Sequence, residues 1–275
     1  MNLYQRVLLV GMPWLMLSAG ASAQRYKIWQ EKPGTWCLSA GVGTTRYAGD
    51  MNERGDLSHL RLGAALNVGV AYRLSYKLTF RTEAQLYYIY GSHRHTRIEY
   101  NNLSFHSLNP DVWTGLQYDF WPIDDPYRAT IPYAFAGVGL TYLTPKATYK
   151  GQSYSLAPLR TESVEYNRLP VMFRYGLGLP VVATERFRIN IEGSYTHVMS
   201  DYVDDVSTIY PDRTTMEPLA AALSDRRLEI GQTPNSIGAQ RGNSNRNDGY
   251  FIVSGRLIFI LITPGQRSYR RMIGR

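Results

Sequence analysis

The chain has 275 residues, 44% of them hydrophobic and 19% charged, with 22 tyrosines, 24 glycines and one cysteine. The single cysteine, Cys37, excludes a disulfide framework and a paired-cysteine metal motif. The formal net charge is +8, but the basic residues are dispersed and form no patch on a recognisable module, so nucleic-acid binding is not expected.

The N-terminal 23 residues have the features of a signal peptide. Arg6 precedes the apolar run VLLVGMPWLML, and Ala21-Ser22-Ala23 follows as a small-residue cleavage signal. We therefore expect residues 1–23 to be cleaved on export and residues 24–34 to form a short N-terminal lead. No later apolar run approaches the ~18 residues of a membrane helix.

Residues 60–90 alternate with a period of two, which predicts two extended strands. The even positions are apolar, small or aromatic, with Thr82 as the exception, and the odd positions include arginines, a lysine and a glutamate. Each strand is about twice the ~5–6 residues of an ordinary strand and close to the ~9–11 that cross a bilayer. An uncharged outer face with aromatic ends and a charged inner face favours a transmembrane barrel over a large soluble sandwich.

The parity of these two strands also predicts their turn. Because both place even positions outward, the loop between them must have an odd length. A three-residue loop at 74–76 would pair Gly69 with Arg81 and Gly63 with Tyr87. Small residues would then leave room for large side chains inside a narrow barrel.

Further alternating segments bring the predicted strands to eight. In chain order they cover residues 35–47, 60–72, 76–90, 105–120, 131–143, 169–181, 187–199 and 249–262. The barrel thus spans residues 35–262, with long loops at 144–167 and 200–248, and a basic C-terminal tail follows at 263–275. An even strand number and connections that alternate between long and short are typical of outer-membrane barrels, whose short turns face the periplasm. The predicted fold is all-β: an eight-stranded antiparallel transmembrane β-barrel of outer-membrane type with long external loops.

The inward face of the predicted barrel is charged. Its charged residues include Arg61, Arg81, Glu83, Asp111, Asp119, Arg174, Arg188, Glu192 and Arg256. An eight-stranded barrel is too narrow for a water-filled pore, and a buried charge without a partner is costly. We therefore expect these side chains to pair with one another as a scaffold and not to form a conduction path.

The residues give little support to an enzyme. Five histidines occur, but no HExxH, paired-cysteine or glycine-rich phosphate motif. A lipid hydrolase would need a serine and a histidine two apart on a lipid-facing strand, and His197 and Ser200 have the wrong spacing. We expect no catalytic residue, cofactor, metal or small-molecule substrate.

The most distinctive polar segment is SDYVDDVSTIYPD, residues 200–212. Four aspartates crowd there: Asp201, Asp204, Asp205 and Asp212. They could hold a cation through oxygen ligands, although the spacing is not that of an EF-hand loop. The favoured interpretation is that they cap turns and order the loop. Helical spacing of apolar residues over 216–228 predicts a short helix, with Pro218 near its start.

Several segments together resemble a known family. They are LSAGVGTTRYAGDMN, LAPLRTE at 156–162, SDYVDDVSTIYPD, and Arg241-Gly242 followed by Asp248-Gly249-Tyr250. In combination they are similar to PorG-type outer-membrane proteins of the type IX secretion and gliding machinery. The TEG usual in that family reads Thr161-Glu162-Ser163 here. The signature residues, to which a structural role is assigned, are Asp201, Tyr202, Asp204, Asp205, Ser207, Tyr210, Asp212, Arg241, Gly242, Asp248 and Tyr250.

The resemblance implies a non-enzymatic component of a type IX secretion system that anchors the periplasmic ring to the outer membrane of a diderm bacterium and supports protein export. Its partners would be outer-membrane lipid and the ring proteins. From the topology we expect the tail to face the ring through Arg267, Arg270, Arg271 and Arg275. One interpretation of the aspartate-rich signature is a plug in the barrel mouth. The alternatives are an OmpA-like small barrel for envelope integrity or ligand binding and, less favoured, an outer-membrane lipid hydrolase.

Overall fold

The computed structural model of the chain describes residues 32–51, 59–125, 127–128, 130–184 and 186–261. The predicted signal peptide (1–23), residues 24–31 of the predicted lead and the predicted basic tail (263–275) lie outside the described residues. The four tail arginines proposed as ring contacts belong to this last segment.

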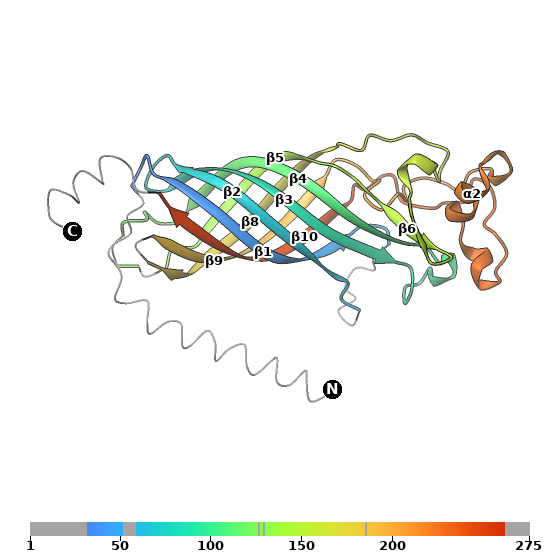
Figure 1. Cartoon of the computed structure of the whole chain (residues 1–275), viewed down its shortest axis with the longest axis horizontal. Coiled ribbons are helices and arrows are strands. Elements are labelled where there is room, and N and C mark those ends of the chain that lie inside the picture. Colours follow the sequence, from blue (N-terminus) through green and yellow to red (C-terminus); the bar gives the residue numbers. More distant parts are fainter. Residues whose placement is uncertain (1–31, 52–58, 126, 129, 185, 262–275) are drawn as a thin grey trace, which may run out of the picture.

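Eight long antiparallel strands form one closed ring (Figure 1). They are β1 (Trp36–Ala48), β2 (Leu62–Arg73), β3 (Leu78–Ser92), β4 (Ser104–Asp119), β5 (Tyr133–Thr141), β8 (Val171–Ala183), β9 (Phe187–Val198) and β10 (Gly249–Ile260). Each strand pairs with the next along this order, and β10 pairs back onto β1 from Cys37↔Ile260 to Ala48↔Gly249. The predicted fold class, an eight-stranded antiparallel barrel, is therefore confirmed.

The barrel is apolar outside and polar inside. Leu66, Val68 and Val70 on β2 are exposed, whereas Asn67 between them is buried. The same alternation follows every strand, because successive side chains of a strand point to opposite faces. An exterior of exposed leucine and valine around a charged, buried interior is the arrangement of a transmembrane barrel.

The β2–β3 register differs from the predicted one by two residues. Tyr87 faces Ala65 and not Gly63, and Gly69 faces Glu83 and not Arg81. The cause is the turn, which comes one residue later than predicted: the Ser75 hydroxyl accepts the backbone N–H groups of Lys77 and Leu78. Small residues still oppose large ones, since a Cβ at Gly69 would lie 2.5 Å from Glu83 Cγ.

Charged groups fill the middle of the barrel. Arg81 Nη2 lies 2.6 Å from Glu83 Oε1, and Arg256 bridges Glu83 and Glu192 at 2.5 and 3.0 Å. Arg81 also contacts Glu192 at 3.1 Å. Two arginines and two glutamates thus form a quartet with no net charge, which offsets the cost of burying each ion.

Two smaller groups lie on either side of this quartet. Near the short turns, Arg73 pairs with Asp119. Near the long loops, Asp111 accepts from Arg174 at 2.8 Å, from Gln85 at 3.0 Å and from Tyr250 at 2.8 Å. The prediction that the inward charges pair with one another is confirmed for these residues, and the interior is a packed polar core.

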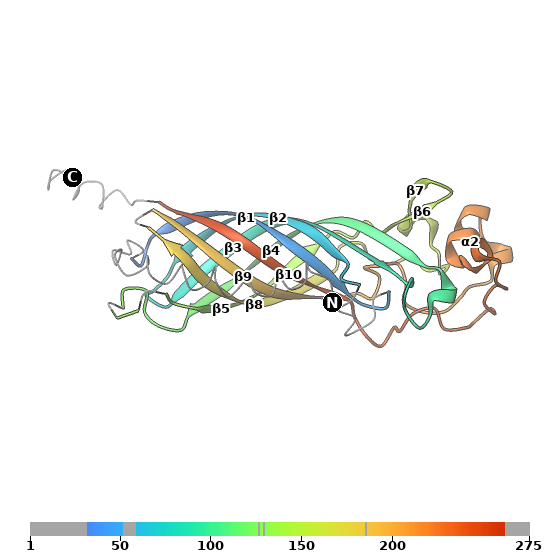
Figure 2. The ribbon, with the colours of Figure 1, turned by 90° about the horizontal axis from the view of Figure 1, so that it is seen from below.

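The two ends of the barrel differ (Figures 1 and 2). The turns β2–β3, β4–β5 and β8–β9 lie at one end, here called the turn end. The long connections lie at the other, the loop end, and contain a hairpin of β6 (Lys146–Tyr149) and β7 (Gln152–Ser155) and the helix α2 (Pro218–Ser224). Four short 3₁₀ helices complete the described elements: Glu99–Asn101, Ala157–Leu159, Arg213–Thr215 and Arg227–Ile230.

Within the described ranges, no helix is long and apolar enough to span a membrane. The helix predicted within 216–228 is shorter than its pattern suggested. It ends at Ser224, and a 3₁₀ turn, Arg227–Ile230, follows.

Candidate functional site at the barrel mouth

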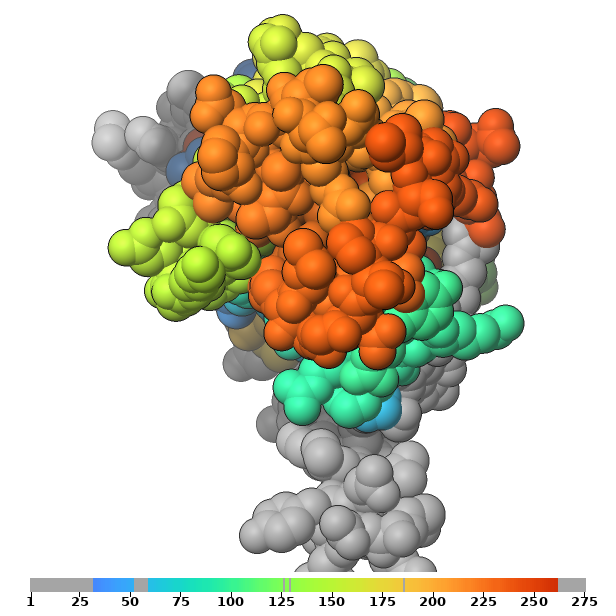
Figure 3. All heavy atoms as spheres, turned by 90° about the vertical axis from the view of Figure 1, so that its right-hand side faces the viewer, coloured from blue at the N-terminus to red at the C-terminus, as the bar shows by residue number. Residues whose placement is uncertain are grey.

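The aspartate-rich loop folds back into the loop end of the barrel, where residues 200–248 cover the mouth (Figure 3). Val203 and Val206 are fully buried in one apolar cluster with Tyr47, Tyr87 and Tyr250 of the strands. Apolar residues at these two loop positions bury little surface unless they pack onto the barrel, and this drives the loop inward. We call residues 200–212 and 241–248, together with Thr161 and Glu162, the mouth plug.

A tyrosine of β1 joins two aspartates of the plug. The Tyr47 hydroxyl lies 2.6 Å from Asp204 Oδ2 and 2.8 Å from Asp248 Oδ1, and all three side chains are buried. The other oxygens of these carboxyls accept backbone N–H groups, Asp204 from Val206 at 2.9 Å and Asp248 from Val203 at 3.2 Å. The barrel wall and the loop are thus tied through one hydroxyl.

The geometry requires a proton shared within this group. A hydroxyl has one hydrogen to donate, so one of the two contacts must be made by a protonated carboxyl that donates to the tyrosine oxygen. Burial raises the pKa of Asp204 and of Asp248, and the neighbouring carboxyl of Asp50 raises both further. Both shifts favour the protonated form of these two carboxyls.

A second hydrogen-bond network of the plug centres on Glu162. Its Oε1 accepts from Arg241 at 2.8 Å and from the Ser207 N–H at 2.9 Å, and its Oε2 accepts from the Thr208 N–H and hydroxyl at 3.0 and 2.6 Å. Arg241 also donates to the Asp205 carbonyl oxygen at 2.5 Å. One carboxylate from the 142–170 connection therefore fixes the signature loop on two sides.

Asp205 is held by hydroxyls from the same connection. Its carboxylate accepts from Thr161 and, at 2.7 Å, from Tyr166. Burial raises its pKa to about 6, opposed by the nearby Arg241 guanidinium. The backbone of Asp205 is left-handed, with φ +66°, as aspartate tolerates better than most residues.

The departure from the TEG pattern falls at a left-handed position. Ser163 has φ +57°, a conformation that favours glycine, so a glycine there would be unstrained. The Thr161 and Glu162 side chains keep their contacts with the rest of the plug in spite of the serine. At Gly242 the reason for glycine is space, because a Cβ would lie 2.7 Å from the Ser207 nitrogen.

The remaining signature residues have separate roles. Tyr202 stacks on Tyr166, with ring centroids 4.3 Å apart, and Tyr250 stacks on Tyr87 at 4.2 Å. The Tyr210 N–H donates to the Ala239 carbonyl and pins the far end of the loop. Asp212 caps the 3₁₀ helix Arg213–Thr215 by accepting the Thr214 N–H at 3.0 Å.

The favoured interpretation of the aspartates, capping and loop ordering, agrees with the contacts of Asp204, Asp205 and Asp212. Asp201 is buried beside Asp50 and Glu162, and burial raises its pKa to about 8. Within the part of the chain that the structure describes, no group of three or more His, Cys, Asp or Glu side chains has an arrangement that could hold a metal ion.

Sequence reasoning assigned no role to Tyr47, Thr161, Glu162 or Tyr166. LAPLRTE marked two of them as part of a distinctive segment, but the alternation pattern ends before that loop. In the sequence, Tyr47 is not distinguished from any other inward-facing tyrosine at the end of a predicted strand. Only the packed loops show that all four hold the plug.

A serine and a histidine that are distant in sequence meet on the outer face of the barrel. His106 of β4 lies with its Nε2 3.1 Å from Ser153 Oγ of β7. The two residues are 47 positions apart in sequence, so a search for short spacings could not find them. The described residues that line the surrounding hollow include no glutamate or aspartate.

A comparison with protein-family models finds no match, and neither does one with curated proteins. Solved structures that resemble the chain include three small outer-membrane barrels. Neisserial surface protein A is 11% identical, with a TM-score of 0.44, over 82% of this chain and 96% of that one. OprG of Pseudomonas aeruginosa is 13% identical, with a TM-score of 0.40, over 85% and 98%.

The N-terminal β-barrel domain of OprF, also of Pseudomonas aeruginosa, is 11% identical, with a TM-score of 0.39, over 84% of this chain and all of that domain. Likeness at this level concerns the fold and adds nothing on function. The outer-membrane type of the barrel follows from its own closed strand ring, apolar exterior and polar core.

Proposed function

We propose that the chain is a non-enzymatic outer-membrane component of a type IX secretion system that anchors the periplasmic ring and supports protein export. The observation that carries the proposal is the convergence of the family-signature residues in one buried plug. Asp204, Asp205, Arg241 and Asp248 come from two distant parts of one loop. Their polar contacts are with the plug, the barrel wall and two neighbouring loop residues, Tyr166 and Ser224. This favours an architectural role over substrate binding.

The topology supports a contact with the ring at the turn end. In outer-membrane barrels the short turns face the periplasm. Strand β10 ends at Ile260 on that side, so the chain leaves the barrel toward the compartment in which the ring would lie. The tail residues Arg267, Arg270, Arg271 and Arg275 follow in sequence and would meet acidic surfaces of the ring proteins.

Deletion of the gene that encodes this chain tests the proposal directly. We expect cargo carrying the C-terminal secretion signal to accumulate inside the cell, and the ring proteins to separate from the outer membrane on fractionation. Normal cargo export in the deletion strain would refute the proposal. Leakage of periplasmic proteins with export intact would favour the OmpA-like alternative instead.

The tail can be tested without removing the barrel. Arg270→Ala with Arg271→Ala should weaken co-purification of the ring while the barrel still assembles. Arg94→Ala with Arg97→Ala removes the same charge from the loop end and should leave the ring bound. Equal recovery of the ring with both variants would exclude the tail as its contact.

The contact between His106 and Ser153 is the observation in favour of a lipid hydrolase. Because the described lining of that hollow offers no acid to orient the histidine, we expect no hydrolysis. Unchanged lipid A masses in the deletion strain would agree with this, and a shift by the mass of one acyl chain would contradict it.

A further inference from the structure

The β6–β7 hairpin lies beside β4 and borders a hollow of about 440 Å³. The single pair His106↔Lys146 joins the hairpin to β4, and the Thr144 hydroxyl donates to the Leu108 carbonyl at 2.8 Å. The hollow opens outside the barrel. It lies nearer the loop end than Asp111↔Thr141, the pair at which the pairing of β4 with β5 ends. It is separate from the mouth plug.

The hollow is lined by cationic and hydroxyl groups. Its lining residues are Tyr88, His106, Leu108, Thr144, Lys146, Ser153, Ser155 and Arg168. No acidic side chain of the described residues lines it or forms an ion pair with Lys146 or Arg168. Arg168 lies over the ring of Tyr142 at 4.6 Å and donates from Nε to the Leu143 carbonyl, which leaves its terminal nitrogens for another acceptor.

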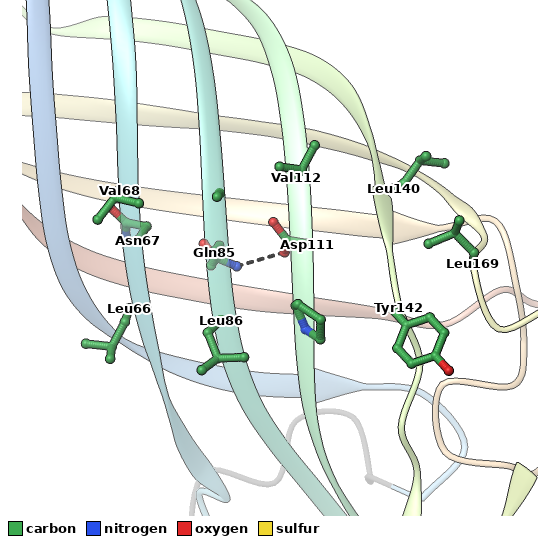
Figure 4. A pocket seen from close by; sticks show the side chains of 12 residues that line it. Leu66, Asn67, Val68, Gln85, Leu86, Asp111, Val112, Leu140, Tyr142 and Leu169 are labelled. Atoms are coloured by element: carbon green, nitrogen blue, oxygen red, sulfur yellow. Dashed lines mark hydrogen bonds between the residues drawn. The ribbon is translucent and has the colours of Figure 1, made fainter.

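An apolar groove of about 640 Å³ lies next to the hollow along β3 and β4, farther from the loop end. Figure 4 shows the groove from close by. Leu66, Leu86, Val112 and Leu140 project into it, while Gln85 and Asp111 are on the inner side of the same strands. Ala84 and Pro110 also line the groove, and their small side chains leave the surface depressed between the larger residues.

The groove and the hollow are continuous along one strand pair. On β3 and β4 the outward rungs are Ala84↔Val112, Leu86↔Pro110, Tyr88↔Leu108 and Tyr90↔His106. The first two rungs line the groove, and the third lines the hollow. Tyr142 belongs to the groove and carries Arg168 on its ring, so the apolar and cationic parts meet there.

We propose that this surface binds a phosphorylated lipid of the leaflet nearest the long loops, with the phosphate between Lys146 and Arg168 and an acyl chain along the groove. A basic pocket next to an apolar lipid-facing groove matches an anionic headgroup joined to a hydrocarbon chain. The hydroxyls of Ser153 and Ser155 add donors to the same headgroup. The proposal requires an outer-membrane barrel and is independent of the secretion role.

Native mass spectrometry of the full chain in detergent tests the proposal. The probes are bis-phosphorylated lipid A, the same lipid with both phosphates removed, and inorganic phosphate. We expect one phosphorylated lipid to remain bound per barrel, the dephosphorylated lipid to be lost, and inorganic phosphate to compete weakly. Fatty-acid release is followed in the same samples.

Two variants separate the two parts of the site. Lys146→Gln with Arg168→Gln should reduce retention by about tenfold or more, because charge-assisted hydrogen bonds to the phosphate are lost. Ala84→Phe should fill the groove and weaken retention while the cations remain. The shift of the folded barrel on unheated gels shows whether each variant assembles.

A matched control removes two cations from the turn end. Lys77 lies over Tyr118 at 6.0 Å and Arg128 over Trp121 at 3.8 Å, but Asp125 lies 3.5 Å from Arg128. Lys77→Gln with Arg128→Gln should leave lipid retention unchanged.

Four results would overturn the proposal. One is equal retention of the phosphorylated and dephosphorylated lipids, and another is retention that Lys146→Gln with Arg168→Gln does not alter. The third is full displacement by inorganic phosphate regardless of Ala84→Phe, which would assign the hollow to a soluble anion. Release of fatty acid that depends on Ser153 would replace binding by catalysis and overturn it too.

Discussion

At the scale of single residues, Glu162 is the most connected group of the mouth plug. It is buried and accepts four hydrogen bonds, from Arg241, Ser207 and Thr208. Glu165, three residues later, pairs with Arg160 in solvent, with 75% of its side chain exposed. An exposed pair contributes little, whereas a buried carboxylate that has lost a partner or its charge is costly.

Glu162→Gln should therefore destabilise the plug, by about 3 kcal/mol, because an amide has one acceptor oxygen in place of two and leaves Arg241 without its charge partner. Hydrogen exchange of the amides in 200–212 measures the effect as faster local opening. Glu165→Gln is the matched control and should change exchange by less than about 0.5 kcal/mol. Equal protection in the two variants would contradict the central role of Glu162.

The buried aspartates predict a dependence of plug stability on pH. The pKa of Asp201 is raised to about 8, and the pKa values of Asp204 and Asp248 are raised too, so the folded plug binds more protons than the open loop between the ordinary value of 3.8 and about 8. Stability must then fall as pH rises through this range, by about 1.4 kcal/mol per pH unit for each proton. Below this range the stabilisation is complete.

We expect the protection factors of residues 200–212, corrected for the intrinsic exchange rate, to decrease from pH 5 to pH 8 and to level off above. Asp201→Asn should flatten part of this slope. Asp212→Asn should leave it unchanged, because the pKa of Asp212 is lowered by its bonds to Thr214. Protection that stays constant over this interval would show that the aspartates are ionised in the folded plug.

At the scale of elements, α2 and the β6–β7 hairpin occupy different positions relative to the barrel. The helix lies over the mouth and buries Ala220, Leu223 and Ser224. The hairpin lies at the side and leaves its strands largely exposed. Seven residues are too few for a helix to be stable alone, so the packing of Leu223 holds α2 in place.

Leu223→Ala should cost about 2–5 kcal/mol of local stability, because the side chain is buried in the same cluster as Val203 and Val206. Limited proteolysis within 213–240 reports the loosening. Leu228→Ala removes a leucine that is 64% exposed and should not change the cleavage rate. If both variants were cleaved alike, α2 would not be anchored by its buried face.

At the scale of the whole molecule, the barrel has a hydrocarbon-compatible exterior and a neutralised interior. The Arg81, Glu83, Glu192 and Arg256 quartet fills the centre, and the plug covers the loop end. Each side of the wall is therefore matched to its surroundings: acyl chains outside and paired ions inside.

This arrangement predicts that a charged substitution on the outer face costs more stability at the centre of the barrel wall than at its edge. Val138→Arg, in the middle of β5 on the outer face, should destabilise the barrel in lipid by about 2–4 kcal/mol. Tyr76→Arg, in the β2–β3 turn, should cost about 0–1 kcal/mol because it lies near the interface. Urea unfolding in liposomes measures both, and equal costs would argue against a membrane-embedded β5.

The sequence by itself determined the barrel, its eight strands and which face of each strand points outward. Alternation of side chains is a local property of extended backbone, so residues 60–90 reveal it without reference to any other part of the chain. The exact β2–β3 register was not determined, because the Ser75 hydroxyl selects the turn and the parity rule allows shifts of two. The secretion role and the signal peptide remain predictions.

Only the tertiary structure decided how the loops fold. The contacts of the plug join residues that are far apart in sequence and share no periodic pattern. Tyr47 is 157 residues from Asp204 and 201 from Asp248, and Glu162 holds the same loop from a third segment. His106 and Ser153 likewise meet only because the β6–β7 hairpin folds back on β4. Contacts between irregular segments depend on where the closed ring places their ends, and that closure is a property of the whole chain.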